Sequence, residues 1–192
     1  MFARYIRPCV SLLTVMTVLL GVLYPLAITG LGQAAFPSQA RGSLIFRGDV
    51  LVGSSLIGQS FTDPKYFWGR PSATTPQPYN GVASGGSNLG PLNPALQDKV
   101  IANVKLFRDA DPTNSSLIPI DLVTASASGL DPDISPAAAE YQAARVALVR
   151  HLPLATVQSI ILQHKKHPLV GLIGEAQVNV LELNLALDSF HQ

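Results

Sequence analysis

Residues 9–30 read CVSLLTVMTVLLGVLYPLAITG, and this stretch determines the architecture of the chain. As an α-helix it would be about 33 Å long, which is enough to cross a hydrocarbon core of about 30 Å. Residues 8–40 contain no Asp, Glu, Lys or Arg. The sequence therefore predicts one N-terminal transmembrane helix at residues 9–31, followed by a single soluble α+β domain at residues 32–192.

The transmembrane stretch contains Gly21 and Pro25, which lie four residues apart and so share one helix face. Pro25 has no backbone N–H, and in lipid a neighbouring helix or a hydroxyl must replace the lost hydrogen bond. A glycine at position 21 permits close approach of another helix. Both residues are therefore candidate interface residues. The alternative is that Gly and Pro are simply common in membrane helices.

The orientation in the membrane is predicted from Arg4 and Arg7, which lie in a short N-terminal segment, residues 1–8. Basic residues beside a membrane helix favour the cytoplasm, so the soluble domain is expected outside. A cleaved signal peptide is the alternative, because residues 38–40 (Ser-Gln-Ala) resemble a cleavage site. The apolar run is longer than the roughly 7–15 residues of a signal peptide, which favours an uncleaved anchor.

The composition excludes some functions. The formal net charge is +1, and 13% of residues are charged, compared with about 25% in a typical soluble domain. Lys and Arg form no basic stripe, which argues against a nucleic-acid partner. The one cysteine, Cys9, lies inside the apolar stretch, so no intrachain disulfide is expected.

The soluble part begins with strand signals. Residues 43–46 and 50–52 are short apolar runs on either side of Arg47-Gly48-Asp49, and they predict a β-hairpin. Residues 117–123 are a further strand candidate. Residues 178–180 leave open whether the C-terminal element begins as a strand or as a helix.

Helices are predicted where a cap residue precedes apolar residues at helical spacing. The predicted helices begin at Pro94 after Asn93, at Pro136 after Ser135, at Leu154, and at Val180 after Asn179. Asn179 and Glu182 resemble a capping box, in which the two side chains satisfy N–H groups at the helix start.

Between the hairpin and the first of these helices, residues 61–94 are rich in proline and glycine. Regular helix or central strand is excluded there, yet Trp68 and Tyr79 need groups to pack against. Long irregular segments with aromatic residues are usually functional. Trp68 and Tyr79 are therefore candidate anchors for a partner protein, and the alternative is that they belong to the domain's own core.

One glycine-rich segment is a candidate for binding a phosphate group. Residues 84–90 read SGGSNLG, in which glycines free backbone N–H groups to point at an anion. No Gly-Lys-Ser/Thr follows, so a Walker loop is excluded, and an ordinary turn is the alternative. The candidate nucleotide-binding residues are Gly85, Gly86, Ser87, Asn88 and Gly90.

The sequence offers little other chemistry. His164 and His167 are one helical turn apart, but further zinc ligands are not evident and two lysines lie between them. No serine lies in a nucleophile motif. We therefore expect no metal site and no catalytic residue, and the chain is not expected to be a self-contained enzyme.

Several ordered motifs together resemble one family, the KdpC subunits of the bacterial potassium-transporting Kdp ATPase. The resemblance runs from the anchor to about Asp188, which is nearly the whole chain. The matching runs are YPL (24–26), QARGSLI (39–45), GSSLIGQ (53–59), YF (66–67), GRPSA (69–73), PYN (78–80), SGGSNLG (84–90), NP (93–94), DLVTAS (121–126), SGLD (128–131), ISPAAA (134–139), VNVL (178–181) and LNLALD (183–188).

The resemblance implies membership of a complex in the bacterial inner membrane. A channel-like subunit of that complex selects potassium, and a P-type ATPase subunit hydrolyses ATP. The KdpC-like chain is then an assembly subunit and a catalytic chaperone, which raises the ATP affinity of the ATPase subunit and has no active site of its own. The implied partners are these two subunits and the lipid bilayer. No tightly bound cofactor is implied, and ATP would at most be shared with the ATPase subunit.

The predicted orientation conflicts with a direct contact to ATP, because little ATP is present outside the cytoplasm. An outer domain would act near the ion entrance, and its effect on ATP would be transmitted through the other subunits. Two other functions remain open: a nucleotide-binding regulatory module that uses the loop at residues 85–90, and a secreted binding protein whose signal peptide is cleaved.

Overall fold

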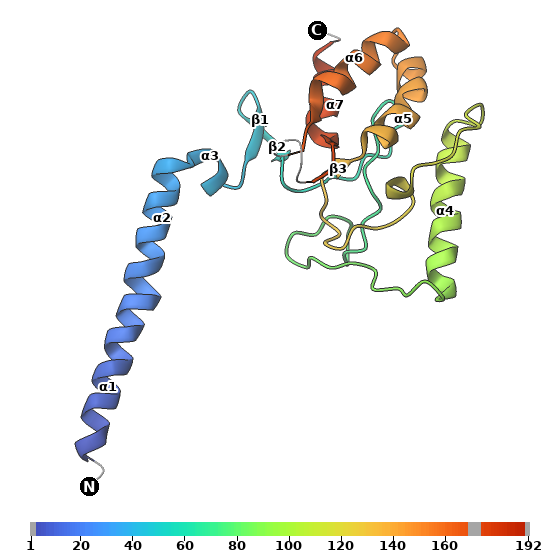
Figure 1. The fold of residues 1–192 in the computed structure, drawn as a ribbon. Coiled ribbons are helices and arrows are strands. Elements are labelled where there is room, and N and C mark those ends of the chain that lie inside the picture. The colour runs from blue at the N-terminus through green and yellow to red at the C-terminus, as the bar shows by residue number, and fades with distance from the viewer. Residues whose placement is uncertain (1–2, 169–173, 191–192) are drawn as a thin grey trace. The chain divides into compact units, whose positions relative to one another are not determined.

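The structure is a computed structural model that describes residues 3–168 and 174–190. The chain forms two compact units, Met1–Leu44 and Ile45–Gln192 (Figure 1). The second unit combines helices with two small sheets, so the predicted α+β class is confirmed.

The first unit is a long apolar helix. It comprises α1 (Ala3–Val18), a π-helical turn η1 (Leu19–Leu23) and α2 (Tyr24–Ala35), and the short α3 (Pro37–Ala40) follows. The helix is continuous and extends beyond the predicted residues 9–31 at both ends. Between Arg4 and Ala35 it is long and apolar enough to cross a membrane, judged by length and composition alone.

The predicted hairpin is confirmed at the start of the second unit. Strand β1 (Leu44–Arg47) pairs with β2 (Val50–Ser54) in a two-stranded sheet. The turn between them contains Gly48, whose φ of +61° lies in the left-handed region that glycine adopts without strain.

From residue 55 to residue 93 the chain forms no regular helix or strand, as its prolines predict. Helix α4 (Pro94–Ala110) then begins at the predicted position. The side chain of Asn93 accepts a hydrogen bond from the Ala95 N–H at 3.0 Å, and proline occupies the first helical position. A local capping signal therefore sets this boundary.

The strand predicted at residues 117–123 is wrong. Ile120–Leu122 instead form a 3₁₀ turn, η2, in which Leu122 N–H donates to Pro119 O at 3.1 Å. Pro119 has no N–H to contribute to a sheet ladder, which disfavours a strand here. The Asp121 carboxylate accepts a hydrogen bond from Ser135 N–H at 2.7 Å, which ties the turn to the start of the next helix.

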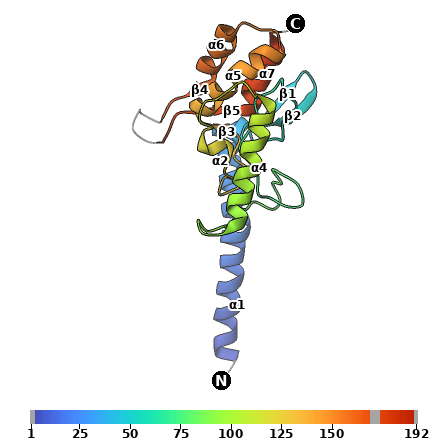
Figure 2. The same ribbon diagram turned by 90° about the vertical axis from the view of Figure 1, so that its right-hand side faces the viewer.

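The rest of the unit is built from three helices and a three-stranded antiparallel sheet of order β3-β5-β4 (Figure 2). Within the described residues these elements are β3 (Asp133–Ile134), α5 (Pro136–Val149), α6 (Leu154–His164), β4 (Lys165–Lys166), β5 (Gln177–Asn179) and α7 (Val180–Ser189). In the central strand, Val178 pairs with Ile134 on one side and with Lys165 on the other.

Both alternatives for residues 178–180 hold in part, because strand β5 ends at Asn179 and α7 begins at Val180. The Asn179 side chain accepts a hydrogen bond from Glu182 N–H at 3.1 Å, as a helix cap does. The cap of α5 is also confirmed, since Ser135 Oγ accepts from Ala138 N–H at 3.0 Å.

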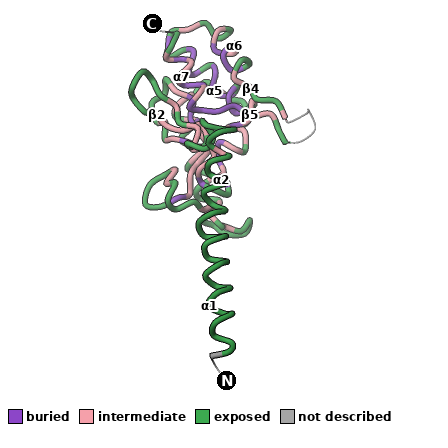
Figure 3. The backbone as a smooth tube through the Cα atoms, turned by 90° about the vertical axis from the view of Figure 1, so that its left-hand side faces the viewer, coloured by how far each residue is buried: buried purple, intermediate pink, exposed green. Residues whose placement is uncertain are grey.

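The hydrophobic core lies where α5, α6, α7 and β5 meet, and Figure 3 shows the buried residues gathered on these elements. Fully buried side chains come from every one of them. They include Ala138, Val146, Val157, Ile160, Ile161, Val178, Leu183 and Leu187. Within the described part of the first unit, by contrast, no residue is buried.

Candidate functional site

The irregular segment around Phe67 is held in the core by side-chain amides rather than by a neighbouring strand. Asn184 on α7 accepts from the Phe67 N–H at 2.8 Å and donates to the Phe67 carbonyl at 3.0 Å. Gln142 on α5 does the same for Trp68, at 2.9 and 3.1 Å. Both amides are buried, so each one satisfies main-chain groups that have no access to water.

Arg145 on α5 supports the same segment from within the core. Its guanidinium donates to the carbonyls of Pro64 and Tyr66, and to the Gln142 side chain at 2.8 Å. It also lies 4.4 Å from the centre of the Trp68 ring, within cation–π range. Burial lowers the pKa of Arg145 to about 10, so this side chain is still charged at neutral pH.

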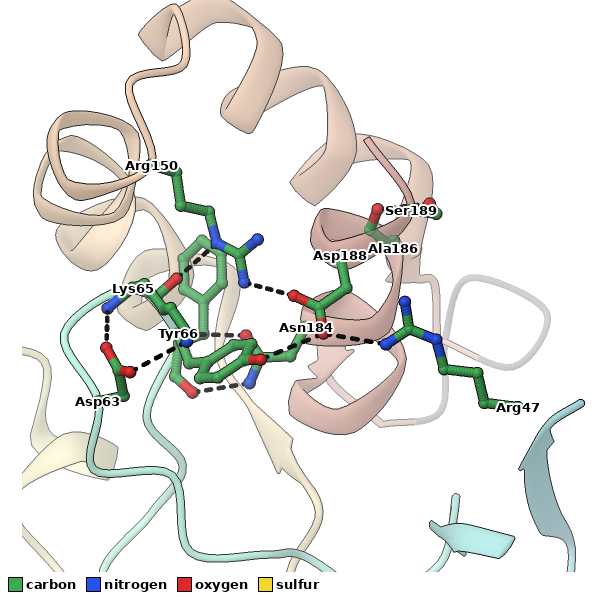
Figure 4. A network of polar contacts seen from close by, with 10 residues as sticks. Arg47, Asp63, Lys65, Tyr66, Arg150, Asn184, Ala186, Asp188 and Ser189 are labelled. Atoms are coloured by element: carbon green, nitrogen blue, oxygen red, sulfur yellow. Dashed lines mark hydrogen bonds and ion pairs between the residues drawn. The ribbon is translucent and has the colours of Figure 1, made fainter. Parts of the chain in front are cut away.

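Asp188 on α7 connects three distant parts of the domain (Figure 4). Its carboxylate accepts from Arg150 at 2.8 Å and from the Tyr66 hydroxyl at 3.1 Å, and lies 3.5 Å from Arg47 of the hairpin. Arg150 also donates to the Lys65 carbonyl at 2.7 Å. The carboxylate therefore joins the hairpin, the irregular segment and the end of α5 to the last helix.

Trp68, one of the predicted partner anchors, lies in the domain's own core. It is 7% exposed, its ring centre is 5.3 Å from that of Phe107, and its indole N–H donates to Asp63 O at 3.0 Å. Phe107 in turn meets Tyr141 edge-on at 6.2 Å. These contacts correspond to the core alternative; a role for Trp68 at a partner interface stays a prediction.

Tyr79, the other predicted anchor, is half-buried and bound within the domain. Its hydroxyl donates to Arg70 O at 2.6 Å, and its N–H donates to Ser72 Oγ at 2.9 Å. A Cβ at Gly58 would lie 2.4 Å from the Tyr79 ring, and a Cβ at Gly69 would lie 2.8 Å from the Tyr79 hydroxyl oxygen. Burial, followed by the Asp131 carboxylate, raises the pKa of Tyr79 to about 12. Its predicted partner contact is likewise untested.

A cleft of about 290 Å³ lies between the irregular segment and α4. Its lining is mostly apolar and aromatic, and Arg70 is the charged residue in it. Arg70 donates to Asp131 at 3.0 Å, while its buried Nε has no hydrogen-bond partner within the described structure. Lining residues include Phe61, Trp68, Tyr79, Leu106, Phe107 and Leu122.

The glycine-rich loop, residues 84–90, packs against residues 127–129. Gly85 N–H donates to Ser128 O at 2.8 Å, so this amide points into the protein. A Cβ at Gly86 would lie 2.9 Å from Ala127 O, while nothing lies within 4 Å of the Cβ position of Gly90. The tight packing accounts for glycine at position 86 without a nucleotide. Nucleotide binding by Gly85, Gly86, Ser87, Asn88 and Gly90 remains an untested prediction.

The glycine-rich loop is part of a longer segment with a composition of its own. Residues 71–97 contain no Asp, Glu, Lys or Arg, and we call them the uncharged tract. Val82 and Leu92, within this tract, are each 97% exposed. Val82 and Leu92 therefore offer apolar area that another protein or a membrane could cover.

The predicted interface residues of the helix lie at its π-helical turn. The Tyr24 N–H donates to Leu19 O, five residues back, and Pro25 follows directly. At Gly21 the nearest atom to a Cβ position is Thr17 Cγ2, at 4.0 Å, so this side of the helix is open. Gly21 therefore lies within the π-helical turn, and Pro25 lies two residues after its end.

Among the described residues, no cluster of three or more His, Cys, Asp or Glu side chains could hold a metal ion. His164 contacts the Ile160 carbonyl at 2.9 Å through Nδ1. The contacts described above hold the domain together. They are the side-chain amides that pair with Phe67 and Trp68, the ion pairs, and the close contacts at glycines.

Comparison with known proteins gives a consistent result. The family model described as KdpC, K⁺-transporting ATPase, c chain, matches residues 6–189. A potassium-transporting ATPase KdpC subunit of Polaromonas naphthalenivorans (strain CJ2) is 64% identical over 96% of this chain and 94% of its own length. Similar proteins of the same description come from Variovorax paradoxus (strain S110), 62% identical over 96% and 95%, and Methylococcus capsulatus (strain ATCC 33009 / NCIMB 11132 / Bath), 54% identical over 97% and 98%.

Proposed function

The chain belongs to the KdpC family of K⁺-transporting ATPase c chains, and from this premise we propose that it is the single-span accessory subunit of an ATP-driven potassium uptake pump. The observation that carries the proposal is the family match, which covers the apolar helix and the folded domain together. In this role the chain has no active site of its own. It assembles with a channel-like potassium-binding subunit and a P-type ATPase subunit in the bacterial inner membrane.

The uncharged tract is our candidate for the surface that meets the pump's other subunits. Its exposed Val82 and Leu92 would be covered in the complex, which supplies the apolar burial that they lack in the isolated chain. In this proposal the buried Trp68 does not contact the partner, and its packing in the core holds the irregular segment in place. A surface without fixed charge also neither repels nor traps a potassium ion that passes beside it.

Co-purification tests this interface. The tagged full-length chain, extracted from membranes in mild detergent, is expected to recover an ATPase subunit and a channel-like subunit. The double variant Val82→Lys/Leu92→Lys should recover less of both. Leu117→Lys is the control. Leu117 is 91% exposed, much like Val82 and Leu92, but it comes after α4 and lies outside the uncharged tract. Failure of the wild-type chain to recover either subunit would contradict the proposed function.

We also propose that the chain raises the ATP affinity of the ATPase subunit from outside the cytoplasm, through the other subunits. The placement is supported by Arg4 and Arg7 at the start of the helix. Ser116 is exposed and offers a labelling position in a Cys9→Ser background, which leaves no other cysteine. A Ser116→Cys chain in intact cells should react with an impermeant thiol reagent. Protection of this cysteine would refute the outside placement.

The effect on ATP has its own measurement. Pump activity should show a higher KM for ATP when the complex is formed with Val82→Lys/Leu92→Lys than with Leu117→Lys. A second candidate mechanism is a direct nucleotide contact by the loop at residues 84–90. It predicts that the purified full-length chain alone binds ATP and that Gly86→Asp abolishes this binding.

A further inference from the structure

The π-helical turn η1 redirects one hydrogen bond of the apolar helix. The N–H of Tyr24 donates to Leu19 O, five residues back. In a regular α-helix the same N–H would donate to Leu20 O, four residues back. The Leu20 carbonyl has therefore lost its α-helical donor.

The next N–H along the chain cannot replace it, because residue 25 is a proline and has no N–H. The hydroxyl of a threonine can donate a hydrogen bond to the carbonyl four residues earlier in a helix, as that of Thr14 does to Val10 O at 2.8 Å. Tyr24 occupies that position relative to Leu20, but its hydroxyl lies at the far end of a rigid ring. Within the described helix, the Leu20 carbonyl thus has neither its α-helical donor nor its π-helical donor.

An unpaired carbonyl is costly in hydrocarbon, since lipid tails offer no hydrogen-bond donor. The adjacent residue is Gly21, whose Cβ position has only Thr17 Cγ2 near it, at 4.0 Å. A second helix can therefore approach the main chain closely at this level.

We propose that the Leu20 carbonyl is a docking point for a transmembrane helix of another pump subunit, and that this helix presents a hydroxyl or amide donor. The proposal rests on the proposed function, which supplies such a subunit. Because the Leu20 carbonyl lacks a donor, the partner side chain must carry an N–H or O–H group. The absence of a side chain at Gly21 leaves room for the partner helix to approach.

A hydroxyl supplied by the chain itself tests the proposal. In Tyr24→Thr the new hydroxyl can donate to Leu20 O, so this carbonyl no longer needs a hydrogen-bond donor from a partner helix. Tyr24→Val is the matched control, because it has nearly the same shape without the hydroxyl. Each variant is co-expressed with a differently tagged wild-type chain, and the complex is purified through its ATPase subunit. The variant-to-wild-type ratio in the complex is compared with the ratio in the membrane.

We expect Tyr24→Thr to be about three- to seventeenfold less represented in the complex than Tyr24→Val, which spans the average and the maximum measured for hydrogen bonds between membrane helices. Pro25→Ala restores an N–H and should act in the same direction. Pro8→Ala, the same change near the start of α1, should not. Equal representation of Tyr24→Thr and Tyr24→Val would overturn the proposal.

Two further outcomes are distinguishable. If the wild-type chain recovers no ATPase or channel-like subunit, the proposed function itself fails and the docking point fails with it. If two tagged copies associate in the absence of other subunits, and Tyr24→Thr but not Tyr24→Val weakens that association, the occupant is a second copy of this chain. The assignment to another subunit would then be wrong.

Discussion

The side-chain amide of Asn184 pairs with both main-chain polar groups of Phe67, at 2.8 and 3.0 Å, in the way that a neighbouring strand would. Phe67 itself is fully buried, and so is the amide. This pairing satisfies the main-chain groups of Phe67 at a point where the proline-rich segment crosses the core without a sheet ladder.

Asn184→Ala should be strongly destabilising, because it leaves the buried N–H and C=O of Phe67 unpaired. At about 1 to 3 kcal/mol for each of the two groups, we expect a loss of about 2 to 6 kcal/mol. Trp68 is the only tryptophan and is buried, so its fluorescence can follow urea unfolding of the full-length chain in detergent. Gln163→Ala, an exposed amide on α6, is the control and should change stability by less than about 0.5 kcal/mol.

The two arginines at Asp188 should contribute unequally to stability. Asp188→Asn leaves the Arg150 guanidinium, which is 4% exposed, without its carboxylate, and should cost about 1 to 3 kcal/mol. Arg47→Gln removes only a half-exposed ion pair and should cost no more than about 1 kcal/mol. The same urea titration compares them, and equal losses would show that Asp188 does not act mainly through Arg150.

Tyr79 should make the domain less stable in alkali. Its pKa is about 12 in the folded state and 10.0 ordinarily, so between these values only the unfolded state loses the proton. Stability contributed by Tyr79 is therefore complete below pH 10 and falls by up to about 3 kcal/mol as the pH rises to 12. The stability gap between wild type and Tyr79→Phe should be constant below pH 10 and narrow above it. A gap that stays constant up to pH 11.5 would contradict the assignment.

Glycine at position 129 should be essential for the packing of the loop at residues 84–90. Gly129 has a φ of +67°, and a Cβ there would lie 2.6 Å from both Gly85 O and Thr74 Cγ2. Strain and overlap together should cost Gly129→Ala about 2 to 4 kcal/mol. Gly90→Ala meets open space and should be nearly neutral, within about 0.5 kcal/mol. A thermal melt followed by circular dichroism checks both variants.

The elements that could be predicted from the sequence are those determined by nearby residues. The caps at Asn93, Ser135 and Asn179 each act on an N–H two or three residues away, so the helix starts were placed correctly. The apolar helix and the hairpin around Gly48 are local in the same sense. The strand predicted at residues 117–123 does not form, because Pro119 has no N–H for a sheet ladder and the apolar residues after it enter a turn instead.

The arrangement of the candidate site could not be predicted in the same way. Asn184 lies 117 positions from Phe67, and Gln142 lies 74 positions from Trp68, so no local pattern joins them. The aromatic content of residues 61–94 indicated that something must pack there, and Trp68 does pack, but into its own domain. The exposed Val82 and Leu92 had a signal, the absence of charge from residue 71 to residue 97. That signal gains meaning only once both side chains are known to be uncovered.

The place of α7 in the chain has a consequence for biosynthesis. Asn184 and Asp188 on α7 secure segments made more than a hundred codons earlier. The nascent domain therefore cannot close until α7 has been translated. A message truncated upstream of the α7 codons would yield a polypeptide in which Phe67 and Tyr66 lack these contacts, and its open core would be accessible to proteases.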